Sequence, residues 1–431
     1  MTQLRIYCLI FVFCAAAATT APAQNISYST VASFNGTNGA RPYLMALVQG
    51  SDGNLYGTTW EGGSYSYGTV FSVTPGGTLT ALYSFCSDSP SCPDGYYPYA
   101  GLVQGSDGNF YGTATWGGAY GNNNCAYYGQ NPCGAVFKIT PTGAFTLLYS
   151  FCALGFPCPD GDAPYTPLVP GGDSNFYGTT GGGGEYGAGT VFKITTSGTL
   201  TTMQSFNGSA GNNPSGLMLG SDWNFYGTAH NGGAQWFEPC PPEGCGTVFK
   251  MTRDGTLTPL YSFCHQTGCP DGAGPYGGLV QTSDGSFYGT TSYGGNTACG
   301  YDGQGCGTVF KITANGTFAL LYTFCSQPNC TDGASPTAGL VQGSDGNFYG
   351  TTTSGGALGC GTVFGITPQG ALTTLHSFCS GGTYADGAYP SGGLVQASNG
   401  FFYGTTNGGG IYRDGTVFRF SVTDRCATCR P

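Results

Sequence analysis

The sequence has few charged side chains and very few basic ones. Only 7% of its 431 residues are charged, and 21 acidic residues stand against 11 Lys and Arg, for a formal net charge of −10. Nucleic acids and anionic membrane surfaces are bound through clusters of basic side chains. The composition therefore argues against both as partners.

Histidine is also scarce, and the sequence has no nucleophile elbow, phosphate-binding loop or zinc-protease motif. Of the three histidines, His230 and His265 are expected on one face of the protein, near Glu238 and Glu243. This group is the only one that could supply a general base or a set of metal ligands. We expect a protein without enzymatic activity, with a lyase or hydrolase that uses these four residues as the alternative.

Long hydrophobic runs are missing except at the N-terminus. Residues 6–18 are apolar, Arg5 precedes them, and an Ala-Pro-Ala sequence ends at Ala23. This pattern is typical of a secretory signal peptide. It predicts cleavage of residues 1–23, with residues 24–431 forming one domain that is secreted, periplasmic or displayed at the cell surface. No second candidate for a membrane span follows.

Glycine (79 residues), tyrosine (30) and phenylalanine (28) are abundant, and they recur in a repeat. The sequence GLVQGSDGNFYGTATWGG at residues 101–118 has seven near copies, each with Tyr-Gly-Thr followed by a Gly-Gly doublet. Asp-Gly and Thr-Gly turns between β-rich runs indicate hairpins. The second copy predicts four strands, at 102–104, 109–113, 135–140 and 144–151. The signature tyrosines are Tyr56, Tyr111, Tyr177, Tyr226, Tyr288, Tyr349 and Tyr403.

The two ends of the chain predict a closed ring. The seventh repeat ends after its third strand, at residues 415–421, and residues 28–34 resemble the missing fourth strand. An open solenoid would have distinct capping repeats instead. We therefore predict an all-β fold, a seven-bladed β-propeller of four-stranded blades that the N-terminal strand closes.

The repeat also resembles a known family. The pattern L-V-x-G-x-D-G-x-[LF]-Y-G-T-T-x-x-G-G, followed by G-T-V-F-K-I-T-x-x-G-x-[LF]-T-x-L-Y-S-F, is similar to the GloVer tandem repeat of secreted bacterial "choice-of-anchor" proteins. The resemblance implies no catalytic residues and no known activity. The present chain ends in Cys426-Ala-Thr-Cys429-Arg-Pro without a hydrophobic sorting tail, so release is expected rather than anchoring.

The variable loops between the second and third strands are the expected place for a binding site. Three of them, in blades two, four and five, are long and rich in aromatic residues, which suits stacking on sugar rings or capture of an extracellular protein. Packing of these rings on each other is the alternative, and a purely structural envelope protein is a third possibility. The candidate binding residues are Tyr120, Tyr127, Tyr128, Trp236, Phe237 and Tyr301.

Cysteines concentrate near the same loops. Without Cys8 and Cys14 the mature chain has 20 − 2 = 18, an even number behind a signal peptide, which predicts disulfides within repeats. Neighbouring cysteines could pair, or the middle two could pair across a hairpin with the outer two joined. Zinc is not expected, because zinc sites need a reducing compartment and usually short C-x-x-C pairs, whereas the signal peptide indicates an oxidising compartment. The eighteen are Cys86, Cys92, Cys125, Cys133, Cys152, Cys158, Cys240, Cys245, Cys264, Cys269, Cys299, Cys306, Cys325, Cys330, Cys360, Cys379, Cys426 and Cys429.

An aspartate recurs four residues before a proline in five repeats. Carboxylates around one rim could bind calcium, which takes oxygen ligands. The simpler interpretation is turn chemistry, since Asp-Gly before proline is common in turns. No cofactor is expected. The five residues are Asp94, Asp160, Asp271, Asp332 and Asp386.

Overall fold

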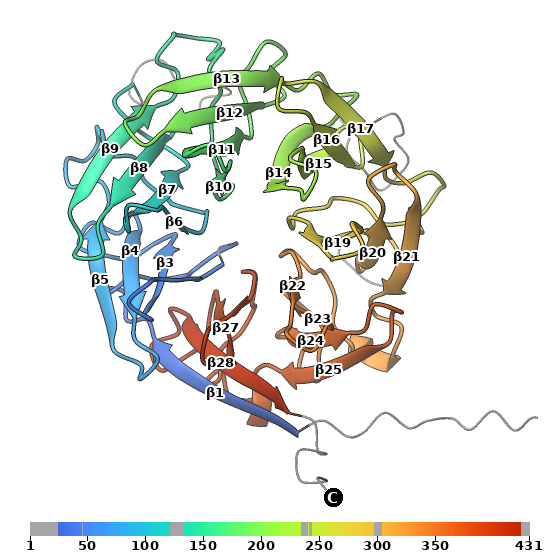
Figure 1. The fold of residues 1–431 in the computed structure, drawn as a ribbon. Helices are drawn as coiled ribbons and strands as arrows, with labels where there is room; N and C mark the ends of the chain where they lie inside the picture. The colour runs from blue at the N-terminus through green and yellow to red at the C-terminus, as the bar shows by residue number, and fades with distance from the viewer. Residues whose placement is uncertain are drawn as a thin grey trace, which may run out of the picture.

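Seven antiparallel four-stranded sheets form a ring around a central channel (Figure 1). The structure, a computed structural model, describes residues 25–44, 46–120, 133–233, 240, 244–296 and 304–423. In each sheet the first strand lies nearest the channel and the fourth lies at the outside. The predicted all-β, seven-bladed propeller is confirmed.

The strands follow one pattern: a short inner strand, two buried middle strands and a longer outer strand. Blade one has β2 Val48–Gln49, β3 Leu55–Thr59, β4 Thr69–Val73 and β5 Leu79–Ser84; blade two has β6 Val103–Gln104, β7 Phe110–Ala114, β8 Ala135–Ile139 and β9 Phe145–Ser150; blade three has β10 Val169–Pro170, β11 Asn175–Thr180, β12 Thr190–Thr195 and β13 Leu200–Ser205; blade four has β14 Asn212–Leu219, β15 Phe225–Asn231, β16 Thr247–Met251 and β17 Leu257–Ser262.

The remaining blades repeat this pattern. Blade five has β18 Val280–Gln281, β19 Phe287–Thr291, β20 Thr308–Ile312 and β21 Phe318–Thr323; blade six has β22 Val341–Gln342, β23 Phe348–Thr352, β24 Thr362–Ile366 and β25 Leu372–Ser377; blade seven has β26 Val395–Gln396, β27 Phe402–Thr406, β28 Thr416–Thr423 and β1 Asn25–Ser33. Two short 3-10 helices, η2 (Pro328–Cys330) and η3 (Ser380–Gly382), lie in loops. Among the described residues, no helix is long and apolar enough to cross a membrane.

The N-terminal strand closes the ring as predicted. β1 pairs with β28 in antiparallel register, from Asn25 opposite Thr423 to Ser33 opposite Thr416. The Tyr28 ring of β1 stacks on His376 of blade six, with 3.7 Å between the ring centroids. Its hydroxyl donates a hydrogen bond to the backbone oxygen of Asp386 at 2.6 Å. The closing strand therefore packs on blade six as well as pairing within blade seven.

The signature tyrosines build the core between blades. Phe110 and Tyr111 are both fully buried and, being consecutive in a strand, point to opposite faces of the sheet. The Tyr56 ring stacks on Phe110 of the next blade with centroids 4.0 Å apart, and Tyr111 packs on Phe176 at 4.4 Å. Four further blade junctions repeat this pair at 4.2 to 4.4 Å. The repeat thus supplies aromatic rings to both faces of each sheet, as its sequence predicts.

One end of the ring, here called the turn face, carries the tight turns between the first and second strands. In blade two, the Asp107 carboxylate accepts hydrogen bonds from the Asn109 side chain at 2.7 Å and the Tyr111 hydroxyl at 2.8 Å. Burial alone would raise the pKa of Asp107, but these bonds outweigh it and lower the pKa below its ordinary value. The equivalent acid accepts the signature tyrosine's hydroxyl in blades one, three, four and six.

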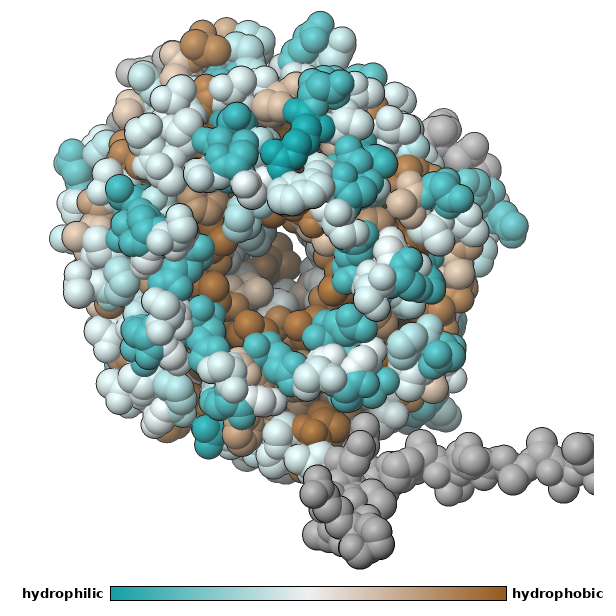
Figure 2. All heavy atoms as spheres, viewed as in Figure 1, coloured by the Kyte–Doolittle hydropathy of each residue, from teal (hydrophilic) through white to brown (hydrophobic). Residues whose placement is uncertain are grey.

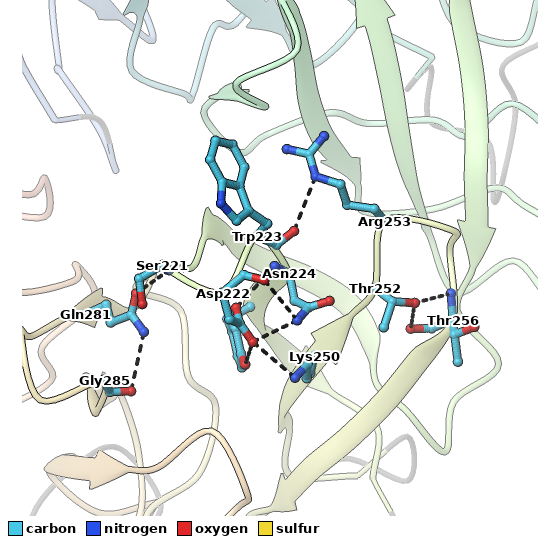
Figure 3. A network of polar contacts seen from close by, with 11 residues as sticks. Ser221, Asp222, Trp223, Asn224, Lys250, Thr252, Arg253, Thr256, Gln281 and Gly285 are labelled. Atoms are coloured by element: carbon cyan, nitrogen blue, oxygen red, sulfur yellow. Dashed lines mark hydrogen bonds and ion pairs between the residues drawn. The ribbon is translucent and has the colours of Figure 1, made fainter.

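Figure 3 shows how the turn of blade four is braced. The Asp222 carboxylate accepts hydrogen bonds from Asn224 and Tyr226 and lies 3.3 Å from the Lys250 amine. The Arg253 guanidinium lies 5.3 Å from the centre of the Trp223 ring, which is 58% exposed. This turn lies at the surface, and each of the polar side chains named here has a partner within blade four.

The inner strands leave an open channel with an apolar wall. Figure 2 shows one face of the ring, where hydrophilic residues surround the opening and hydrophobic residues line it. Leucines that lead into or belong to the inner strands, including Leu217, Leu279, Leu340 and Leu394, line a channel cavity of about 220 Å³. None of the described residues that line this channel cavity is charged.

Candidate functional site

The opposite end of the ring, the loop face, contains a cavity of about 920 Å³, here called the basin. The loop face consists of the connections from second to third strands and from each fourth strand into the next blade. Seven aromatic rings border the basin: Tyr43, Tyr99, Trp116, Phe156, Tyr165, Tyr186 and Tyr276. All seven are at least partly exposed, so the basin is a concave, aromatic surface open to a ligand.

Four of these tyrosines come from one position of the repeat, directly after a proline in the connection between blades. Each proline ring lies against the glycine that precedes the third strand of the previous blade. A Cβ on Gly134, for example, would lie 2.4 Å from Cδ of Pro164. This contact fixes the connection and holds the following tyrosine over the channel mouth. Blades four, six and seven have Ser215, Thr337 and Ser391 at this position.

The basin tyrosines are thus gathered on one side of the ring. Trp60 packs beside two of them, with centroids 6.1 Å from Tyr43 and 5.5 Å from Tyr99. Across the basin the His230 ring lies on Tyr276 with a centroid distance of 3.9 Å. These edge-to-face and tilted contacts hold the rings in fixed orientations, which lowers the entropy lost when a ligand stacks on them.

Six buried side-chain atoms have no hydrogen-bond partner among the described residues. Three are Oδ1 atoms of Asp94, Asp160 and Asp386, and the other three, on residues that do not line the basin, are Nε1 of Trp60, Nδ1 of His230 and Oδ1 of Asn407. These last three side chains occupy the same repeat position, two residues before the Gly-Gly doublet. An unpaired buried polar group costs about 1–3 kcal/mol, so such groups usually serve a ligand or an ordered water. Burial lowers the pKa of His230 to about 4, which keeps its ring neutral near pH 7.

The basin also contains an acid and amides. Asp162 lines it, and burial, with the nearby charge of Asp160, raises the pKa of Asp162 to about 6. The Tyr165 hydroxyl donates a hydrogen bond to Oδ1 of Asn213, which orients that amide at the basin wall. Asn231 contributes a second amide. Sugar hydroxyls need donors and acceptors of this kind beside an aromatic platform.

Of the aromatic residues predicted from the long loops, the structure describes Tyr120. It is 42% exposed on the loop face and is not among the residues that line the basin. Tyr127, Tyr128, Trp236, Phe237 and Tyr301 lie outside the described residues. Loop length does not identify the basin residues, because they lie in the shorter connections between blades. The signal that would have found them is the residue after each recurring proline, which is tyrosine in four of seven repeats.

Of the residues predicted for an enzyme, the structure describes His230 and His265, and these two do not line the same cavity. His230 borders a second cavity of about 340 Å³ together with Cys240, Cys245 and Tyr293, and His265 is not part of its lining. The His265 side chain is about half exposed, and its Nδ1 lies 3.1 Å from the Asp271 carboxylate. Glu238 and Glu243 lie outside the described residues.

The five recurring aspartates each brace their own blade. Asp94 accepts a hydrogen bond from the Tyr83 hydroxyl at 2.7 Å and another from the backbone N–H of Cys86 at 2.9 Å. Tyr149, Tyr261 and Tyr322 donate in the same way to Asp160, Asp271 and Asp332, and His376 takes this place beside Asp386. Among the described residues, the groups of three or more clustered metal-ligating side chains contain cysteines only.

Both cysteine pairings that the sequence leaves open occur. Blade six joins Cys360 to Cys379 across a hairpin, and Cys133 and Cys306 are also disulfide-bonded. Cys125, Cys299, Cys426 and Cys429 lie outside the described residues. The neighbour pairs are Cys86–Cys92, Cys152–Cys158, Cys240–Cys245, Cys264–Cys269 and Cys325–Cys330.

Fold and site together define a closed, disulfide-braced propeller with an aromatic basin on one face. The chain belongs to the Gloeobacter/Verrucomicrobia repeat family, whose model matches residues 18–125, 123–330 and 301–429. The predicted family is thereby confirmed. No curated protein matches the chain.

Solved structures share the fold at low sequence identity. One is the extracellular domain of a protein assigned to a hybrid two-component system of B. thetaiotaomicron, at 14% identity and a TM-score of 0.52. The match covers 91% of the present chain and 41% of that one. Another is puromycin hydrolase, at 12% identity and a TM-score of 0.51, with 84% and 50% covered. The chain thus spans half or less of these two proteins, and the likeness shows the propeller fold alone.

Proposed function

We propose that this protein is a secreted, non-enzymatic propeller that binds a glycan in the basin. The observation that carries the proposal is the meeting of seven exposed or partly exposed aromatic rings around one cavity of about 920 Å³. Aromatic faces stack on the apolar faces of sugar rings, and the neighbouring amides and Asp162 suit their hydroxyls.

Several features support the exported setting. The first 23 residues read as a signal peptide, the blades carry disulfides, and a structural neighbour is an extracellular domain. Disulfides beside the basin would also keep the loop face rigid. A rigid site loses less conformational entropy on binding, which favours recognition.

The direct test is a glycan array probed with the full mature chain and two variants. Tyr276→Ala removes a basin ring, and we expect it to weaken the best glycan signal by roughly tenfold, the effect of about 1.4 kcal/mol. Trp223→Ala is the matched control, because Trp223 is an exposed ring on the turn face. It should leave the signal unchanged.

Two results would reject the glycan proposal. One is an array without any signal from the folded parent chain. The other is equal binding by the parent and a Tyr43→Ala/Tyr276→Ala double variant whose thermal unfolding matches that of the parent. A further control is His265→Ala: His265 does not line the basin, so this variant should bind as the parent does.

A protein partner is the second candidate, favoured by a separate feature of the loop face. In five blades the second residue after the Gly-Gly doublet is a large apolar side chain that is 42% to 59% exposed. Exposed apolar rings in such an arrangement mark protein interfaces more often than sugar sites. Tyr65→Ser with Tyr412→Ser would abolish binding of a protein partner and spare glycan binding, because neither residue lines the basin. The five residues are Tyr65, Tyr120, Tyr186, Leu358 and Tyr412.

A further inference from the structure

Asp162, at the wall of the basin, departs from the repeat. It is the second residue of a Gly-x-x-Pro segment that leads from each blade into the next. In four of the seven segments the second residue is alanine, and none of the other six segments has an acid there. The six equivalent residues are Ala40, Tyr96, Asn212, Ala273, Ala334 and Ala388. An acid is therefore not required for the turn that this segment makes.

Four consecutive glycines, residues 181–184, make room for this carboxylate. A Cβ on Gly182 would lie 2.2 Å from Oδ1 of Asp162, and a Cβ on Gly181 would lie 2.4 Å from Cε1 of Tyr165. Blade two has the large side chain of Trp116 at the position of Gly182. The basin wall at blade three is therefore formed by bare backbone, against which the Asp162 carboxylate and the Tyr165 ring lie.

The Asp162 carboxylate is buried and unpaired. Asp162 is only 8% exposed, and its carboxylate has no hydrogen-bond or ion-pair partner among the described residues. Burial, together with the negative charge of nearby Asp160, raises the pKa of Asp162 to about 6, so the group is still largely ionised near pH 7. A buried carboxylate without a partner is costly, which favours a ligand that supplies one.

We propose that the glycan bound in the basin carries a protonated amine, and that Asp162 accepts hydrogen bonds from its ammonium group. The inference rests on the proposed glycan site and adds the class of sugar. Asp162 and Glu185 are the two charged residues that line the basin, and none of its described lining residues is basic. An acidic sugar would be repelled by the same two carboxylates, whereas an amino sugar is attracted.

The aromatic rings of the basin favour a cation as well. Trp116, Tyr99 and Tyr276 line the same cavity as Asp162. The face of such a ring carries partial negative charge and attracts an ammonium group, tryptophan most strongly. A neutral hydroxyl gains only an ordinary hydrogen bond from the carboxylate, whereas an ammonium group gains a charge-assisted one. The rings and the unpaired carboxylate together therefore suit a protonated amine better than a hydroxyl.

The experiment compares three oligosaccharides that share their ring and linkage. They are β-1,4-linked oligomers of glucosamine, N-acetylglucosamine and glucose, which carry an amine, a neutral acetamide and a hydroxyl at the same carbon. Isothermal titration calorimetry of the full mature chain near pH 7 gives a Kd for each. We expect the glucosamine oligomer to bind about tenfold more tightly than the other two, because a charge-assisted hydrogen bond is roughly twice as strong as a neutral one.

Two variants assign the preference to one carboxylate. Asp162→Asn keeps the shape of the side chain and removes its charge, so it should weaken binding of the glucosamine oligomer by about tenfold and leave the glucose oligomer nearly unchanged. Asp88→Asn is the matched control, because Asp88 is an exposed acid that does not line the basin, and it should bind all three oligomers as the parent does. Thermal unfolding verifies that both variants fold.

The outcomes separate this inference from the glycan proposal. Equal affinity of the parent for the glucosamine and glucose oligomers would overturn the inference and leave the glycan proposal standing. So would a preference for the amine that persists in Asp162→Asn. A parent chain that binds no oligosaccharide, or whose glucosamine oligomer is displaced equally well by a simple alkylamine, would reject both.

Discussion

The turn face and the loop face are built from the same seven repeats, yet they treat their polar groups differently. On the turn face, the Asp107 carboxylate receives the Asn109 and Tyr111 side chains, and other blades repeat this set. On the loop face, Nε1 of Trp60 and Nδ1 of His230 are buried without a hydrogen-bond partner among the described residues. The turn-face acids thus find partners within their own turns, whereas the loop face keeps buried polar atoms without a partner among the described residues.

The faces differ in the same way in their aromatic rings. Tyr111 is fully buried and packs on Phe176 of the next blade, so its ring holds two blades together. Tyr99 and Tyr276 remain partly exposed around the basin. The free energy of unfolding should therefore depend mainly on the buried rings, whereas ligand binding should depend on the partly exposed ones.

The largest expected effect is on a signature tyrosine. Tyr111→Ala removes a fully buried ring and should lower the free energy of unfolding by about 3–5 kcal/mol. Tyr99→Ala, in the basin, should cost less than half as much because its ring is only partly buried. Urea unfolding of both variants measures the difference. Equal losses would contradict the division between the two faces.

The second largest effect is expected on how the free energy of unfolding depends on pH. The pKa of His230 falls to about 4 in the folded protein, so between pH 6.5 and 4 the unfolded chain takes up a proton that the folded protein does not. Its contribution to the free energy of unfolding is therefore complete above pH 6.5 and is lost as the pH falls to 4, by roughly 3 kcal/mol at most. His230→Gln should remove this loss, as measured by urea unfolding across that range.

Two controls sharpen the acid experiment. Trp223→Ala removes a side chain without a titratable group and should leave the pH profile of the parent. Asp162 acts in the opposite direction: its pKa is raised to about 6, so its contribution to stability grows as the pH falls from 6 toward 3.8. Asp162→Asn should therefore steepen the acid loss. An unchanged profile in His230→Gln would show that another group causes the loss.

A smaller effect is expected at the turns. Asp107→Ala leaves the Tyr111 hydroxyl and the Asn109 amide without their acceptor and should cost about 1–3 kcal/mol. Blade seven has asparagine at this position, and Asn399 donates to the Tyr403 hydroxyl at 2.9 Å. Asp107→Asn should therefore recover most of the loss in the same unfolding assay. A failure to recover would mean that the carboxylate charge matters more than the hydrogen bond.

The smallest effect is expected for Trp223→Ala on the turn face. The ring is 58% exposed, and its main partner is the Arg253 guanidinium at 5.3 Å. Surface changes of this kind usually alter stability by within about 0.5 kcal/mol. Thermal unfolding should show a small shift at most. A large loss would show that the turn face depends on this stacked pair.

The sequence was sufficient to predict the seven-bladed propeller because each repeat has the same pattern of strands and turns. The Tyr-Gly-Thr signature predicts a strand packed on both faces, and both Phe110 and Tyr111 are indeed buried. The seventh repeat lacks a fourth strand, which predicts that residues near Tyr28 complete blade seven. In the structure β1 pairs with β28. Strand ends in blade two differ from the prediction by one residue.

The basin could not be predicted in the same way, because its rings are distant in the sequence. Tyr43 and Tyr276 belong to connections in different blades, and only closure of the ring brings them to one cavity. The cysteine pairing was open for a related reason. The third cysteine of a set bonds the second in blade six and the fourth in blade one, so spacing cannot choose between them.

The most direct test of the account is a crystal structure of the protein with the glycan that gives the strongest array signal. The account predicts a sugar ring stacked on Tyr276 or Tyr99 in the basin, with a hydroxyl hydrogen-bonded to the Asn213 or Asn231 amide. A sugar bound on the turn face, beside Trp223 for example, would contradict it. So would a complex in which the basin keeps only solvent.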